Sequence, residues 1–168
     1  MDRDTLMTAV EESWRRFDAA IAGLDEAALT VPGVVGEWSI KDLVGHVATW
    51  EQRAVQHVER WRRGEPPEVG AVSTDEYNAR EAARRHGWTL AKVMDDAADT
   101  RLSLRAALTS ITDTEWATVI TIEERVRTGG EWIGGALGGD EGPGTHAAEH
   151  ATEIRAWRDA RVEREGSA

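Results

Sequence analysis

Two histidines near the end of the chain, His146 and His150, lie four residues apart. In an α-helix this spacing puts both imidazole rings on one face, one turn apart and within reach of a single ion. A third histidine, His46, lies beside the apolar stripe of another predicted helix, so its ring is directed toward the same interior. Three imidazoles with open coordination positions are typical of a catalytic metal site. The sequence therefore predicts a divalent-metal site, for which Zn or Ni fits best, with Fe or Mn as alternatives.

Two glutamates close to this pair are candidates for supporting roles. Glu149 is a candidate fourth ligand or general base, although its spacing puts it off the histidine face, where a solvated surface position fits equally well. Glu153 lies three residues after His150 and can orient that ring. The three histidines also have an interpretation without any ion, as hydrogen-bonded residues of the core or its rim. Spacing alone does not separate these interpretations.

Three further residues are candidates for the wall of a substrate pocket. Arg53 lies seven residues after His46, two turns along the same helix face, where it could bind an anionic group; a surface salt bridge is the competing interpretation. Trp50 falls on the apolar stripe of that helix, where core packing also explains it. Trp132 lies in a Gly-rich segment and could either close over a ligand or fill one end of the fold. The remaining histidines, His57 and His86, are expected at the surface or at helix caps.

Helical periodicity supplies the elements that must position these residues. Apolar residues recur at steps of three and four over 6–24, 43–61 and 90–111, and again after Thr145 in the final helix. The second of these helices begins at a capping box of Ser39 and Asp42, and the run RRGEPP ends it. We expect a short or partly exposed helix over 74–85, and a long Gly-rich loop over 112–144 that holds a hairpin and serves as a lid. The simplest architecture is all-α, a four-helix bundle forming one domain over 1–168.

Composition narrows the classes of function. The 168 residues carry a formal charge of −11 and no cysteine, which argues against nucleic acid or an anionic membrane as partner and means that any thiol chemistry needs an external thiol. The mean hydropathy is −0.49, and no run of apolar residues is long enough for a transmembrane helix. No secretory signal, phosphate-binding glycine loop or serine-hydrolase elbow is visible. We expect a cytoplasmic protein that binds a small-molecule substrate, with a homodimer as an open possibility.

Two sequence blocks resemble the DinB/YfiT-like superfamily and within it the ClbS/DfsB-type branch. They are GEWSIKDLVGHVATWE at 36–51 and GTHAAEHATEIRAW at 144–157, together with RGEPP at 63–67 and the pair Tyr77-Asn78. The resemblance implies a four-helix bundle in which His46, His146 and His150 bind a divalent metal. Members of the superfamily include thiol transferases and isomerases that use mycothiol or bacillithiol, and the ClbS-like branch includes a self-resistance protein that opens a genotoxin's cyclopropane. The chain departs from the pattern at Ala147 and Ala148, where aromatic residues are expected.

These observations lead to three hypotheses of different class. The first is a metal-dependent enzyme that acts on a small molecule by hydrolysis or by transfer of a low-molecular-weight thiol such as mycothiol or bacillithiol. The alternative is a metal-free small-molecule binding or self-resistance protein of the ClbS-like type, which would bind its ligand tightly without an ion. The third is an interaction module that dimerises through an exposed helix face.

Overall fold

Four long helices dominate the computed structural model, which describes residues 1–65, 73–122, 124–139 and 141–166. The long helices are α1 (Arg3–Ile21), α3 (Ile40–Arg62), α5 (Leu90–Ser110) and α8 (His146–Gly166). The shorter elements are α2 (Glu26–Thr30), α4 (Thr74–Arg85), α6 (Asp113–Ala117), β1 (Val119–Ile122), β2 (Arg125–Thr128) and α7 (Gly129–Ala136). The predicted all-α four-helix bundle is confirmed. None of the described helices is both long and apolar enough to cross a membrane.

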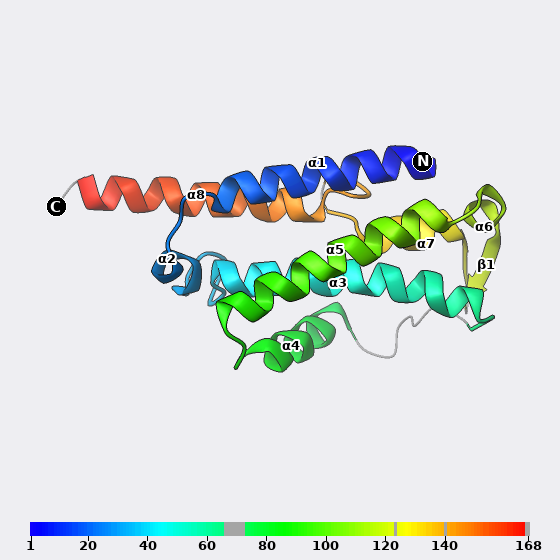
Figure 1. Cartoon of the computed structure of the whole chain (residues 1–168), viewed down its shortest axis with the longest axis horizontal. Coiled ribbons are helices and arrows are strands. Elements are labelled where there is room, and N and C mark those ends of the chain that lie inside the picture. Colours follow the sequence, from blue (N-terminus) through cyan, green and yellow to red (C-terminus); the bar gives the residue numbers. More distant parts are fainter. Residues whose placement is uncertain (66–72, 123, 140, 167–168) are drawn as a thin grey trace.

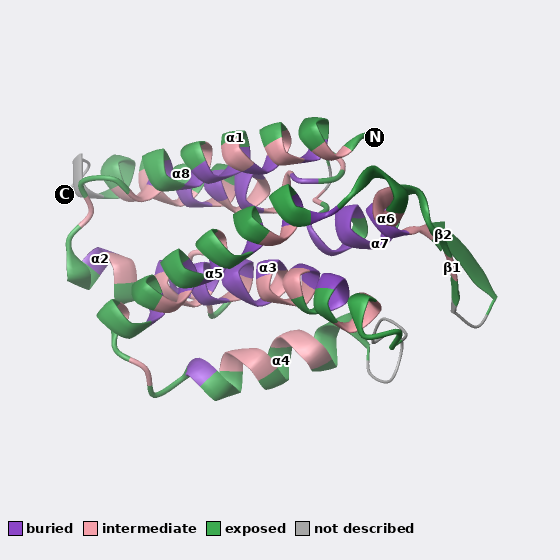
Figure 2. Ribbon diagram, turned by 45° about the vertical axis from the view of Figure 1, so that its right-hand side comes forward, coloured by how far each residue is buried: buried purple, intermediate pink, exposed green. Residues whose placement is uncertain are grey.

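The long helices form two parallel pairs that pack against each other (Figure 1). In the first pair, α1 and α8 run in the same direction, since the Ala148 amide donates to Ser13 Oγ at 2.7 Å and Arg158 donates to the carbonyl of Ala20 at 2.6 Å. In the second pair, α5 runs parallel to α3, because the connection through α4 brings the chain back to the start of α3. Figure 2 shows the buried residues on the helix sides that face between the pairs.

The core lies where the apolar stripes predicted it. On α1 the stripe residues Leu6, Val10 and Phe17 are at most 3% exposed. At the start of α3 the Ser39 amide donates to Asp42 Oδ2 at 2.9 Å, and the Asp42 amide donates to Ser39 Oγ at 3.2 Å, which confirms the capping box. The helix ends at Arg62 as expected, and Pro66 and Pro67 of the RGEPP run lie outside the described residues.

The segment 112–144 is more structured than the predicted loop. The hairpin is present, with β1 and β2 paired antiparallel so that Val119 faces Thr128. The helix α7 was not predicted, because its sequence begins with two glycines. Those glycines allow close packing: a Cβ added at Gly130 would come within 2.3 Å of the Trp116 ring. Because Gly130 has no side chain, α7 can pack directly against the Trp116 ring. This packing outweighs the weak helix propensity of glycine.

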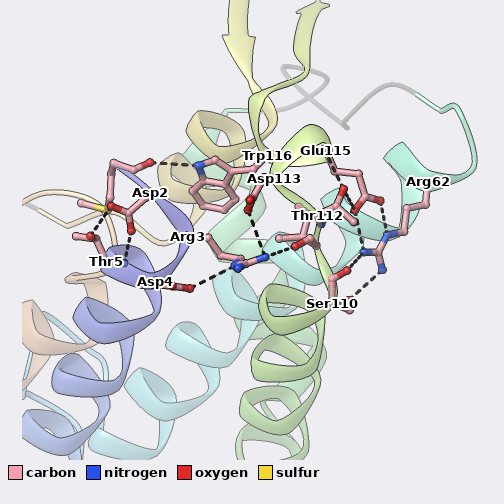
Figure 3. Close-up of polar contacts among 12 residues, drawn as sticks. Asp2, Arg3, Asp4, Thr5, Arg62, Ser110, Thr112, Asp113, Glu115 and Trp116 are labelled. Carbon is pink, nitrogen blue, oxygen red and sulfur yellow. Dashed lines mark hydrogen bonds and ion pairs between the residues drawn. The ribbon is translucent and has the colours of Figure 1, made fainter.

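Polar contacts tie the connection after α5 to two other helices (Figure 3). The guanidinium of Arg62, at the end of α3, donates to Glu115 Oε1 at 3.0 Å and to Ser110 Oγ at 3.1 Å. From α1, Arg3 donates to the carbonyl of Ile111. The indole of Trp116 donates to the carbonyl of Met1 at 3.2 Å. This end of the bundle is therefore held by hydrogen bonds and ion pairs as well as by apolar packing.

A buried cation, Arg85, helps to attach the helix α4 to the bundle, and it is 5% exposed. Its guanidinium donates to Thr49 Oγ1 at 2.7 Å, to Asp96 Oδ2 at 3.1 Å and to Glu81 Oε2 at 3.2 Å. The arginine also passes close to Gly45, where an added Cβ would come within 2.9 Å of its Cδ. This attachment places α4 beside α3.

Candidate metal centre

The three predicted histidines meet between α3 and α8. His46 Nε2 lies 3.1 Å from His146 Nε2, which lies 3.2 Å from His150 Nε2. Within the described parts of the chain, they form the one group of three or more histidine, aspartate or glutamate side chains whose ligand atoms all lie within 4.8 Å of one another. The Nε2 atoms of His146 and His150, one turn apart on α8, therefore meet that of His46 on the inward face of α3, as the sequence predicted.

The arrangement of nitrogens fits a bound cation. Two imidazole nitrogens on one tetrahedral zinc ion at 2.0–2.1 Å lie about 3.3 Å apart, close to the separations found here. Glu153 Oε2 lies 2.6 Å from His150 Nδ1, so that nitrogen carries the proton and Nε2 keeps its lone pair. His146 Nε2 faces the Nε2 of both other rings, and a neutral ring nitrogen either donates or accepts but does not do both. A cation satisfies all three lone pairs together.

Burial keeps two of these rings in the neutral form that binds metals. It lowers the pKa of His46 to about 2, with the neighbouring His146 and His150 lowering it further. It likewise lowers the pKa of His146 to about 3, with His150 adding to the effect. At neutral pH both rings are therefore unprotonated and ready to donate a lone pair without releasing a proton first.

Aromatic and cationic side chains border the three histidines on one side. Trp50, expected in the core, is half-buried and donates from Nε1 to Asn78 Oδ1 at 3.1 Å. Its ring centroid lies 6.5 Å from that of His46 and 6.3 Å from that of His146. The guanidinium of Arg53 lies 5.1 Å from the Trp50 ring centroid and 4.5 Å from that of Tyr77. Of the candidate pocket residues, Trp50 and Arg53 thus lie together at this wall.

Glu149 and Trp132, the other two candidates, lie elsewhere. The carboxylate of Glu149 is directed toward Gly139, where an added Cβ would come within 2.8 Å of Oε2, and it is not part of the cluster of ligand atoms. Trp132 is buried in α7, with the guanidinium of Arg127 5.2 Å from its ring centroid. Its burial favours the interpretation in which it fills one end of the bundle.

Two buried polar residues of α3 were missed. His57 was expected at the surface, which is wrong: it is 7% exposed, and neither ring nitrogen has a hydrogen-bond partner within the described part of the chain. Burial lowers the pKa of His57 to about 4, and the charges of Arg53 and Arg60 add to this. Glu51 is 4% exposed. Both residues continue the buried stripe of Val47 and Ala54 at steps of three or four. The helical period therefore indicated their burial, although polar residues are not usually expected in a core.

Comparison with known proteins places the chain in a family. Residues 9–154 match the profile of the DinB superfamily, whereas none of the curated proteins compared matches the sequence. Among solved structures, an uncharacterised protein from Escherichia coli UTI89 is similar with a TM-score of 0.76 at 12% identity, over 95% of this chain and 94% of that one.

Two further structures carry functional descriptions. The sibling lethal factor precursor DfsB has a TM-score of 0.72 at 9% identity, over 96% of this chain and 97% of its own. A mycothiol-dependent maleylpyruvate isomerase has a TM-score of 0.71 at 13% identity, over 92% of this chain but only 61% of its own length. At such identities the structures share the fold. The family match covers most of the sequence, and the chain belongs to the DinB superfamily.

Proposed function

We propose that this protein is a divalent-metal-dependent enzyme that acts on a small molecule, by hydrolysis or by transfer of a low-molecular-weight thiol. The observation that carries the proposal is the convergence of three imidazole Nε2 atoms at 3.1 and 3.2 Å, with a carboxylate holding the far nitrogen of one ring. His46, His146 and His150 would hold the ion, for which Zn or Ni fits best, with Fe or Mn as alternatives.

The residues around the histidines have distinct tasks in this proposal. The ion would lower the pKa of a water or thiol, or polarise a substrate carbonyl. Glu153 fixes the ring of His150 through Nδ1. Trp38, whose ring centroid is 4.9 Å from that of His46, and Trp50 shield the site from water. Arg53 supplies a positive charge for an anionic substrate group at the wall formed with Tyr77.

One observation supports a thiol as the second substrate, and the composition indicates where that thiol would have to come from. The chain contains no cysteine, so a sulfur nucleophile would have to come from an external thiol such as mycothiol or bacillithiol. The fold is similar to that of a mycothiol-dependent isomerase, although the match spans 61% of that chain. Transfer would form a bond between the thiol sulfur and an electrophilic substrate carbon and break the bond from that carbon to its leaving group, which departs with the electron pair, while the thiol proton is released to solvent.

The metal-free alternative, a small-molecule binding or self-resistance protein of the ClbS-like type, is supported by the similarity to DfsB in fold. It needs an enclosed site for its ligand. Beside His46 the described residues enclose a cavity of about 20 Å³, bordered by Trp38, Asn78 and Arg85. That volume suits a water molecule and is far smaller than a drug-sized ligand, and it would exclude a substrate of that size equally. What favours the metal-dependent enzyme is the convergence of the three imidazole Nε2 atoms.

Elemental analysis of protein purified without a His tag tests the proposal. We expect about one Zn, Ni, Fe or Mn ion per chain, lost in His46→Ala and in His150→Ala. The matched control is His86→Ala, an exposed histidine at the end of α4, which should keep the ion. A wild-type protein without metal, even after addition of Zn or Ni, would overturn the proposal and leave the metal-free binding protein as the better account.

A turnover assay then separates the two reaction classes. The metal-loaded protein is incubated with p-nitrophenyl acetate, and with chlorodinitrobenzene in the presence or absence of mycothiol or bacillithiol. Thiol-independent release of p-nitrophenol would assign hydrolysis. Thiol-dependent release of chloride, with formation of a carbon–sulfur bond, would assign transfer. Either activity should disappear when the ion is removed by a chelator and return when it is added back.

A further inference from the structure

A buried carboxyl group of α3, Glu51, contacts α1, whereas the neighbouring Trp50 contacts α4. Glu51 of α3 is 4% exposed, and its Oε1 accepts a hydrogen bond from Trp14 Nε1 at 2.5 Å. Burying a carboxyl group costs stability unless its oxygens are well supplied with donors. Within the described residues, the Trp14 indole is the one donor found for the Glu51 carboxyl oxygens, so burying this residue lowers the free energy of unfolding.

A small cavity connects Glu51 with one of the histidines. Its wall includes Glu51, Ser13 and His146, and its volume is about 10 Å³. This is close to the smallest space that holds one water molecule, and the polar groups in the wall are the partners that a buried water needs. The cavity lies where α1, α3 and the first residues of α8 meet.

The ring of His146 lines this cavity, and its second nitrogen needs a partner. Its Nε2 is directed at His46 and His150, and a ligand that uses Nε2 carries its proton on Nδ1. Metal-binding histidines nearly always donate that N–H to a carboxylate, a carbonyl or a water molecule. His150 has Glu153 for this purpose, at 2.6 Å. For the ring of His146, the hydrogen bonds found within the described residues both involve Nε2.

We propose that Glu51 orients His146 through a single water molecule in this cavity, and is thus a positioning residue of the metal centre. The water accepts from His146 Nδ1 and donates to the Glu51 carboxylate. The inference rests on the proposed function, because the Nδ1 proton is fixed only when Nε2 binds an ion. Both metal-binding histidines of α8 are then oriented by a carboxylate, Glu153 at the surface and Glu51 inside the bundle.

The test measures zinc affinity at pH 8 by competition with a chromogenic chelator, in wild type, Glu51→Gln and Glu51→Met. We expect both variants to bind Zn²⁺ roughly 10- to 100-fold more weakly, the range found when such outer partners of metal ligands are removed. Glu115→Gln is the matched control, since it removes a carboxylate of α6 that contacts Arg62 at the far end of α3, and it should leave the affinity unchanged.

The visible absorption spectrum of Co²⁺-loaded protein separates orientation from simple charge. If Glu51 holds the ring of His146, the Co²⁺ bands of Glu51→Gln shift or change in intensity, while its metal-free form unfolds at no lower temperature than wild type. Unchanged zinc affinity, or weaker affinity with an unchanged Co²⁺ spectrum, would overturn this inference and leave the three-histidine site intact. A wild-type protein that binds no Zn²⁺ would overturn both.

Discussion

Replacing Glu51 with glutamine should make the metal-free protein more stable at pH 8 and leave its stability nearly unchanged near pH 4. Burial raises the pKa of Glu51 from 4.5 to about 7, the charge of Asp18 adds to the rise, and Trp14 and Arg101 oppose it. The folded protein therefore holds this proton more tightly than the unfolded chain does. As pH rises from 4.5 to 7, the unfolded chain ionises first and the folded state loses stability, with no further loss above about pH 7.

The size of the effect follows from the difference between the two pKa values. A rise from 4.5 to about 7 corresponds to about 3 kcal/mol, at roughly 1.4 kcal/mol for each pKa unit. Glutamine has nearly the same shape, keeps an oxygen that accepts from Trp14 Nε1, and has no charge to bury. The variant should therefore gain up to about 3 kcal/mol over wild type at pH 8.

Urea denaturation followed by tryptophan fluorescence, at pH 4.5, 6 and 8 with EDTA present, measures this gain. Glu115→Gln serves as a control of opposite sign. Hydrogen bonds from Arg62 and Thr112 lower the pKa of Glu115 to about 2, so its carboxylate stabilises the fold above pH 4.5 and that stability is lost as pH falls. A stability difference between wild type and Glu51→Gln that stays constant from pH 4.5 to 8 would refute the reasoning.

Three further predictions concern other described residues. His57→Leu should resist acid better than wild type. Because the pKa of His57 is lowered to about 4, the wild-type fold loses stability as pH falls from 6.5 toward 4. Urea denaturation at pH 7 and pH 5 should show a larger stability difference between variant and wild type at pH 5. Arg85→Met should cost about 3 kcal/mol in urea denaturation, because it leaves Asp96 and its other acceptors without their buried donor. Gly130→Ala should lower the melting temperature, because overpacking against Trp116 costs about 1–3 kcal/mol. Its control, Gly87→Ala, meets nothing within 4 Å and should melt like wild type.

The sequence predicted those parts of the fold that depend on local periodicity. The stripe of α1, from Leu6 to Phe17, is buried because the 3.6-residue period directs it to one side whatever the tertiary partners are. The capping box at Ser39 depends only on residues 39 to 42. The convergence of the histidines was predictable for the same reason, since a pair at i, i+4 shares a face and His46 lies beside the stripe of its helix.

What the sequence did not predict depends on contacts between distant segments. Trp50 lies on a helical stripe, yet it is only half-buried and faces Asn78 of α4. The helix α7 packs closely because Gly130 fits against Trp116. The low helix propensity of glycine argued against a helix there, and nothing in the sequence indicated this contact. Glu51 and His57 were placed at the surface or overlooked because ionisable residues are rarely buried. In each case packing overrode the preference of the residue itself.

The parallel pairing of α1 with α8 affects the order in which the chain assembles during translation. Helix α1 is synthesised before the other described helices and packs mainly against α8, the last of them, so its apolar face lacks its main partner until α8 has been made. The pair α3 and α5, separated by far fewer residues, can form earlier because closing a shorter loop costs less entropy. His46 therefore lies on a helix pair that can form before His146 and His150 have been synthesised. We expect an ion to be bound only after α8 has been synthesised and docks beside the pair of α3 and α5.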